Sequence, residues 1–136
     1  MNYLLDTNIC IALINGTSPR ARLRLSRAVR AGASLATSSI VVHELWYGVA
    51  KSQLVEQNAR ALAAFLGRDI SVVDFTATDA QAAGEIRATL ERAGKRIGEY
   101  DTLIAGQAFR RNLILVTANT REFDRVKGLV VEDWTK

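Results

Sequence analysis

Short apolar runs alternate with amphipathic stretches along the whole chain. The apolar and β-branched runs predict strands over 2–5, 33–37, 70–75, 113–117 and 129–131. Apolar residues spaced three and four apart predict helices over 8–14, 19–31, 39–51, 54–66, 79–93 and 99–111, with a turn or short helix over 119–125. Strands that alternate with helices are typical of a mostly parallel sheet covered by helices. We therefore expect an α/β fold, with residues 1–136 forming a single domain.

Capping residues mark several of these boundaries. Ser18 and Pro19 suit the N-cap and first turn of the second helix, and Gly32 ends it. We expect Thr78 or Asp79 to cap the helix that runs to residue 93. Residues 38–66 predict two consecutive helices without a strand between them, a hairpin suited to a clamp or a dimer surface.

Composition narrows the function only slightly. The net charge of +4 permits an anionic partner without requiring one. The only cysteine, Cys10, excludes an internal disulfide, and with His43 the only histidine a zinc site is not expected. Apolar runs are too short to span a bilayer, and we find no signal peptide. These features predict a cytoplasmic protein without a membrane partner.

Three acids occupy positions where an isolated carboxylate is costly to bury. Asp6 ends the first strand, while Glu44 and Asp101 fall within the apolar faces of their helices. Each has a simple alternative explanation when taken alone. Asp6 would only cap a helix, Glu44 would lie at an exposed edge, and Asp101 would be a first-turn acid favoured by the helix dipole.

Together the three acids indicate a cation site. The carboxyl ends of parallel strands form the crevice where α/β proteins bind ligands, and Thr117 and Asn119 end another strand there. Clustered carboxylates are the usual ligands of Mg²⁺ or Mn²⁺. Such an ion suits phosphodiester cleavage by an activated water. Basic side chains would contact the phosphate backbone of such a substrate, and the candidate contacts are Arg20, Arg24, Arg27, Lys95 and Arg96.

Other chemistries fit these residues less well. His43 has no serine in a nucleophile-elbow context, and no glycine-rich phosphate loop is present. The exposed or buried state of the large aromatic residues is not evident from the pattern. We interpret them as core or interface residues rather than base-stacking platforms: Trp46, Tyr47, Tyr100 and Trp134.

Four motifs in register resemble the PIN domain family. They are Leu5-Asp6-Thr7-Asn8, the segment 39–48 around Glu44, the segment 98–105 around Asp101, and the segment 116–123. Within that family the chain is similar to the VapC-type ribonuclease toxins of bacterial toxin–antitoxin pairs, and its closing segment 125–134 also resembles that group.

The resemblance implies both a fold and an activity. It implies a three-layer α/β sandwich, an Mg²⁺- or Mn²⁺-dependent endoribonuclease acting on RNA (tRNA being one candidate), a homodimer, and a cognate VapB-type antitoxin that inserts a segment near the active site. Asp6, Glu44 and Asp101 match the catalytic, metal-binding acids. Thr7 and Asn8 match the polar residues that order the first acid.

One position departs from the family pattern. Many PIN domains have Asp where this chain has Asn119, which leaves three acids, with Glu122 as a substitute for the fourth. We therefore expect one firmly bound ion rather than two. The departure also keeps open a catalytically weak PIN-like protein that binds RNA or a partner without cutting. A haloacid-dehalogenase-type phosphatase fits less well, because Asn8 stands where that chemistry needs a second Asp.

Overall fold

A single five-stranded sheet forms the centre of the computed structural model, which describes residues 2–136. All four strand pairings are parallel, and the strand order is β3-β2-β1-β4-β5. The strands are β1 (Asn2–Leu5), β2 (Ser34–Ser38), β3 (Ile70–Val73), β4 (Ile114–Val116) and β5 (Val131–Glu132). The predicted parallel sheet is therefore confirmed.

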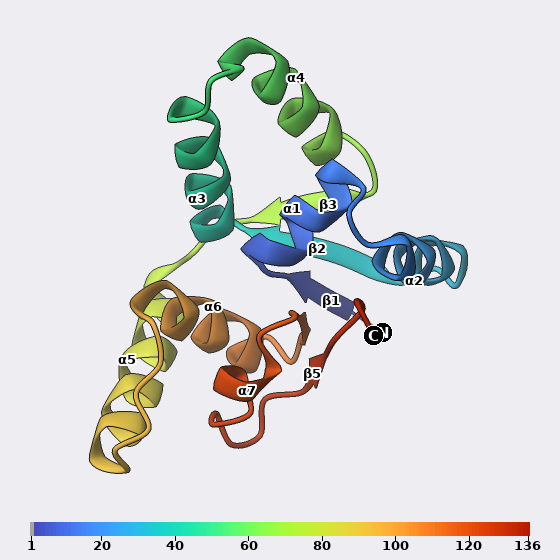
Figure 1. Ribbon diagram of the computed structural model, residues 1–136. Coiled ribbons are helices and arrows are strands. Elements are labelled where there is room, and N and C mark those ends of the chain that lie inside the picture. Colours follow the sequence, from blue (N-terminus) through green and yellow to red (C-terminus); the bar gives the residue numbers. More distant parts are fainter. Residues whose placement is uncertain (1) are drawn as a thin grey trace.

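Helices cover both faces of this sheet. They are α1 (Thr7–Asn15), α2 (Pro19–Arg30), α3 (Ser39–Ala50), α4 (Val55–Leu66), α5 (Ala77–Arg92), α6 (Glu99–Arg110) and α7 (Thr120–Phe123). Figure 1 shows α1 and α4 on one side of the sheet and α5 and α6 on the other. The connection from β3 through α5 and α6 returns to β4 on the far side of β1, which reverses the direction of winding at β1. The ends of β1 and β4 therefore lie at the switch point where such sheets bind ligands.

Several predicted boundaries were wrong, including the end of β3, which was predicted at residue 75 and lies at Val73. The N-cap of α5 is Thr76 rather than Thr78 or Asp79, because Thr76 and Asp79 form a capping box in which each side chain accepts a hydrogen bond from the other's backbone N–H. The last strand covers 131–132 rather than 129–131. At its start, only the carbonyl of Val130 reaches the sheet, accepting from the N–H of Leu115 at 2.9 Å.

The core lies on both faces of the central strands. Leu4 and Leu5 of β1 and Leu115 and Val116 of β4 are completely buried. Near-continuous apolar sequence is what a strand covered on both sides requires. Cys10 is buried with them, and burial raises the pKa of its thiol to about 12, which makes it unreactive.

The second helical layer depends on close backbone contact between α5 and α6. A Cβ added to Gly106 would lie 2.6 Å from the Cα of Ala83, so no larger residue fits at this crossing. The same layer holds Gln107, whose buried amide donates to the carbonyl of Asp74 at 3.2 Å. These contacts hold α6 against the sheet and so fix the position of Asp101 in its first turn.

The chain ends pack against each other. The rings of Tyr3 and Trp134 lie 5.1 Å apart, and Figure 1 shows the two termini on the same side of the molecule. Trp134 is buried, as interpreted from the sequence, and Arg24 lies over its ring. Within 2–136, no helix is long and apolar enough to cross a membrane.

Candidate active site

Asp6 occupies the junction between β1 and α1. It is the N-cap of α1, and its Oδ1 accepts a hydrogen bond from the N–H of Ile9 at 3.0 Å. Its Oδ2 accepts a second hydrogen bond from the hydroxyl of Thr117. The capping role is therefore real, but it uses only one of the two carboxylate oxygens, and the other is aimed at the end of β4.

Thr117 links the ends of three strands. Its N–H donates to the carbonyl of Glu132 at 3.0 Å, which ties β4 to β5. Its hydroxyl donates to Asp6 and accepts from the N–H of Asn119 at 2.9 Å. The polar residues that follow the fourth strand thus orient the first acid and turn the chain into α7.

Glu44 reaches this edge from α3. The hydroxyl of Thr7 donates to its Oε1 at 2.8 Å. Thr7 was expected to order Asp6, but it orders Glu44 instead, because it is the first residue of α1 and faces α3. Asn8 was expected to share that role, but it is exposed and makes no side-chain hydrogen bond with the described residues.

Asp101 lies in the first turn of α6 and is half-buried. Its pKa is raised to about 6, firstly by burial and then by the negative charges of Glu122, Asp6 and Glu44. A Cβ on Gly98, the N-cap of this helix, would lie 3.4 Å from the Asp101 carboxylate. The small cap leaves one side of Asp101 open.

Glu122 is the acid that sequence reasoning placed only as a substitute. It lies on α7, and the amide of Asn119 donates to its Oε2 at 3.2 Å. It also contributes more than any other charge to the raised pKa of Asp101. Asn119 therefore positions a carboxylate three residues later in the chain, and that spacing was the available signal for Glu122.

The acids influence one another electrostatically. The pKa of Asp6 is raised above its usual value, firstly by burial and then by the charges of Glu44 and Asp133, although hydrogen bonds from Thr117 and Ile9 oppose the shift. The salt bridges among residues 2–136 all involve other acids, so no Lys or Arg compensates this group. An uncompensated group of carboxylates has the charge and the oxygen ligands that suit a hard divalent cation.

The acids share a negative electrostatic environment, but their side chains are not close together. Across residues 2–136, no three His, Cys, Asp or Glu side chains stand close enough to hold a metal ion as they are. Like charges in a partly buried site repel one another, and a bound cation removes that repulsion. The residues therefore fit a divalent ion in chemistry and charge, and binding would draw their side chains together.

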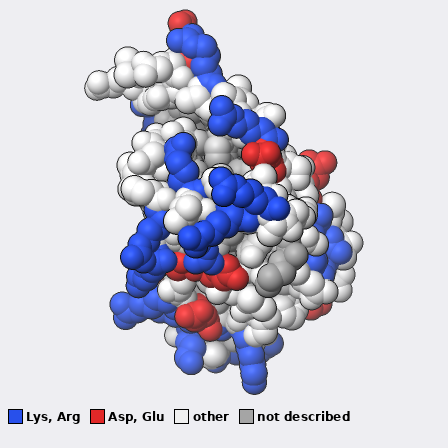
Figure 2. All heavy atoms as spheres, turned by 90° about the vertical axis from the view of Figure 1, so that its right-hand side faces the viewer, with Lys and Arg blue, Asp and Glu red and all other residues white. Residues whose placement is uncertain are grey.

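The candidate RNA contacts lie in two places. Arg20, Arg24 and Arg27 belong to α2, which Figure 1 places on the opposite side of the molecule from α3 and α6. Figure 2 shows basic side chains spread across that face. Arg24 is already engaged by Glu132 at 3.1 Å. Lys95 and Arg96 precede α6 and are exposed close to Gly98 and Asp101 in the chain.

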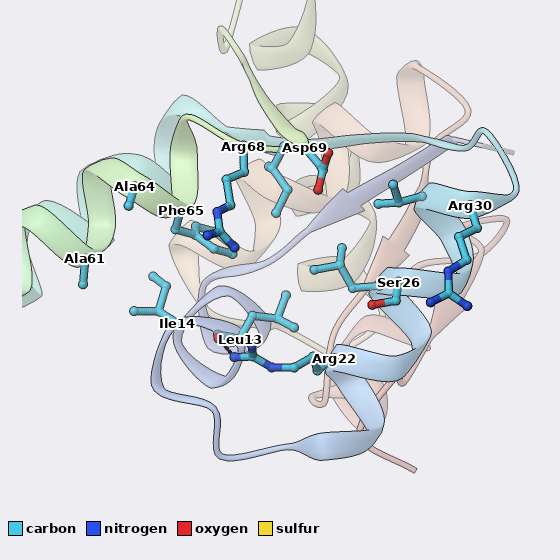
Figure 3. Close-up of a pocket in the computed structure, with 13 residues that line it drawn as sticks. Leu13, Ile14, Arg22, Ser26, Arg30, Ala61, Ala64, Phe65, Arg68 and Asp69 are labelled. Atoms are coloured by element: carbon cyan, nitrogen blue, oxygen red, sulfur yellow. Dashed lines mark hydrogen bonds between the residues drawn. The ribbon is translucent and has the colours of Figure 1, made fainter.

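Two cavities lie beside α1, and one of them reaches Glu44. The larger, about 540 Å³, lies between α1, α2 and α4, and its lining is mostly apolar, with three arginines (Arg22, Arg30 and Arg68) and one acid, Asp69. Figure 3 shows Phe65 beside Arg68, with Arg30 on the opposite side of the cavity. The smaller, about 410 Å³, lies between α1, α3 and α4 and includes Glu44. Ile14 and Ala61 line both cavities.

Comparison with known proteins decides the family. The PIN domain model matches residues 3–129, nearly the whole chain. The chain belongs to the PIN domain family. The resemblance noted from the four sequence motifs is therefore confirmed, and the residues that carried it are the ones gathered at the ends of β1 and β4.

Relatives that match over their full length show which group of PIN domains this chain is similar to. The chain is 44% identical to the tRNA(fMet)-specific endonuclease VapC of Shigella flexneri, with 99% of each chain covered. It is 43% identical to ribonuclease VapC2 of Rickettsia felis over the full length of both. The similarity to VapC-type ribonucleases expected from the sequence is thus confirmed.

Solved structures of the same group share the fold. A crystal structure of Rickettsia felis VapBC2, bound to a fragment of its promoter DNA, matches with a TM-score of 0.92 and 40% identity, covering 98% of this chain and 99% of that one. DNA-bound VapBC of Salmonella typhimurium matches with a TM-score of 0.90 and 39% identity, covering 98% of both chains.

Proposed function

We propose that this PIN domain is an endoribonuclease toxin that cleaves RNA with a divalent cation held by Asp6, Asp101 and Glu122, with Glu44 completing the site directly or through water. The observation that carries the assignment is a group of partly buried acids with no Lys or Arg partner, in which burial and then the charges of neighbouring acids raise the pKa of Asp6 and Asp101. A hydrolytic nuclease of the VapC type is the class to which the full-length relatives belong.

Each residue has a distinct task in this proposal. Asp6 is held by Ile9 and Thr117, so its orientation is fixed before RNA arrives. Asp101 is only half-buried, so its carboxylate is accessible to the cation and to a water molecule beside it. Glu122 is held by Asn119, which restores the fourth acid that Asn119 itself does not provide.

The family implies a divalent cation, and Mg²⁺ or Mn²⁺ suits these oxygen ligands best. When bound, it would lower the pKa of water and stabilise charge on the scissile phosphate. The protein residues then need only bind, orient and accept a proton, because no side chain is required as a nucleophile. This division of labour explains why the lone His43 and the buried Cys10 take no catalytic role here.

Cleavage by purified variants tests the assignment. Asp6→Asn and Asp101→Asn should each reduce Mg²⁺-dependent RNA cleavage by at least a hundredfold, because each removes a charge from the cation site. Asp69→Asn is the matched control, since Asp69 is exposed and lies in the cavity beside α1 and α2. Initiator tRNA is the first substrate to try, given the specificity named for the Shigella flexneri relative. Full activity in either site variant would refute the assignment, and uncleaved RNA with all proteins would favour a binding protein.

A VapB-type antitoxin is the partner expected from the VapBC complexes. We infer that a segment of it lies in the larger cavity, because a mostly apolar lining in which three arginines outnumber the one acid suits an amphipathic segment that carries acidic side chains. Ile14 and Ala61 connect this cavity to the smaller one, which ends at Glu44. A segment that follows both cavities would reach the carboxylates and block them.

Filling the cavity should separate neutralisation from cleavage. Ala64→Trp places a large side chain in the larger cavity and should weaken antitoxin binding at least tenfold without changing RNA cleavage. Ala63→Trp is the matched control, because Ala63 is exposed on the same helix but outside both cavities. Equal antitoxin affinity for both variants, measured by calorimetry, would exclude this binding path.

Two further expectations belong to the same proposal. We propose a homodimer, for which the exposed side chains of the α3–α4 hairpin, including Leu54 and Val55, offer an apolar surface. A cytoplasmic location follows from an RNA substrate in bacterial relatives. Light scattering of the purified toxin tests the first, and fractionation of expressing cells tests the second.

A further inference from the structure

Two aromatic rings, one from α3 and one from α6, lie against each other where these helices meet. The rings of His43 and Tyr100 have centroids 5.7 Å apart and planes tilted by 45°. Both residues are exposed, and Tyr100 keeps 47% of its surface in water. Tyr100 was expected to be a core or interface residue, and it is not part of the core.

Their position in the chain connects them with the cation site. His43 directly precedes Glu44, and Tyr100 directly precedes Asp101. The helices α3 and α6 are in contact. The same contact therefore brings together the two rings and brings Glu44 and Asp101 to one edge of the sheet. The two rings and these two acids are therefore supplied by neighbouring positions on the same pair of helices.

Folding gives no reason for an exposed ring at position 100. Tyr100 lies in the first turn of α6, where small polar or acidic residues are favoured, and the cap of that helix is Gly98. Tyr47, by contrast, has the ammonium group of Lys51 4.7 Å above its ring. Exposed aromatic faces near a phosphate site are the usual means by which proteins hold unpaired bases, since every base has a flat face to stack.

We propose that Tyr100, supported by the tilted ring of His43, stacks a base of the RNA next to the scissile phosphate and so selects unpaired RNA. This inference rests on the proposed nuclease site but concerns a different step, the positioning of substrate. Tyr100 holds the nucleotide, whereas the acids act on the phosphate. In the absence of a divalent cation, when no RNA is cleaved, RNA binding is therefore expected to depend on the Tyr100 ring.

The test uses the full-length toxin in EDTA and a single-stranded RNA dodecamer with one 2-aminopurine, placed at each position in turn. Stacking quenches 2-aminopurine fluorescence. Tyr100→Leu should lose the quenching at one position and about tenfold in RNA affinity, while Tyr100→Phe keeps both. Phe109→Leu is the matched control, because Phe109 is 44% exposed on the same helix, roughly 13 Å further along its axis.

Two results would overturn the proposal. One is equal quenching and affinity for Tyr100→Leu and the parent. The other is a change of Tyr100→Leu from dimer to monomer in light scattering, which would make the ring part of a subunit interface. The stacking test is independent of the cleavage test. Loss of quenching in Tyr100→Leu would support stacking whether or not Asp101→Asn still cleaves RNA.

Discussion

At the scale of single residues, the site depends on how each carboxylate is held. Asp6 receives one backbone and one hydroxyl hydrogen bond, Glu44 receives one hydroxyl, and Glu122 receives an amide. Asp101 is different, because its nearest charged neighbours are other acids. The sequence predicted three of these acids from their unfavourable positions. It could not predict that Thr7 holds Glu44, because that contact depends on how α1 and α3 face each other.

The raised pKa of Asp101 makes a prediction about stability. The unfolded carboxyl titrates near pH 4 and the folded one at about 6. The folded state therefore holds its proton more tightly, and stability that is fully present below pH 4 is lost as the pH rises through 6. In EDTA, the parent should lose about 1 kcal/mol of stability over this pH range that Asp101→Asn does not lose. This figure allows for the partial exposure of Asp101.

Urea unfolding at intervals between pH 4 and 7 measures this difference. The free energy of unfolding of the parent should fall relative to Asp101→Asn as the pH rises, and the gap should close when Mg²⁺ is added to the parent. Parallel curves for the two proteins would contradict the raised pKa.

At the scale of helices and strands, Asp79 connects α5 with the end of α6. It is completely buried, closes the capping box with Thr76, and accepts hydrogen bonds from Arg110 and Arg111 at 2.8 Å each. Burial would raise its pKa, but the hydrogen bonds from Arg111, Thr76 and Arg110 outweigh this and lower it. The sequence pattern placed the helix here but missed the cap, since the Thr-x-x-Asp spacing competes with equally plausible caps at the next residues.

Removing this charge should loosen the layer that carries Asp101. Asp79→Asn leaves two arginines without their acid and should cost about 3 kcal/mol in the free energy of unfolding. Glu91→Gln is the control, because it breaks the exposed pair with Arg87 and should cost less than 1 kcal/mol. Chemical denaturation at pH 7 measures the free energy of unfolding of both variants. Equal losses would show that Asp79 contributes no more to stability than an exposed salt bridge.

At the scale of the whole molecule, the strand order sets the position of the candidate site. Reversal of winding at β1 brings the ends of β1 and β4 together, and α3, α6 and α7 close around them. The alternation of strands and helices was predictable because each strand is short, apolar and bounded by turn residues. The grooves beside α1 and the aromatic pair were not, because they arise where helices distant in the chain meet.

The central claim is that four carboxylates at this switch point hold a divalent cation. Calorimetric titration of Mn²⁺ into the parent, Asp6→Asn, Asp101→Asn and Glu122→Gln measures it directly, with Glu85→Gln as an exposed acid on α5 for comparison. We predict a single site in the parent and at least a tenfold loss of affinity in each of the three site variants, with Glu85→Gln unchanged. Parent-like affinity in the three site variants would contradict the account.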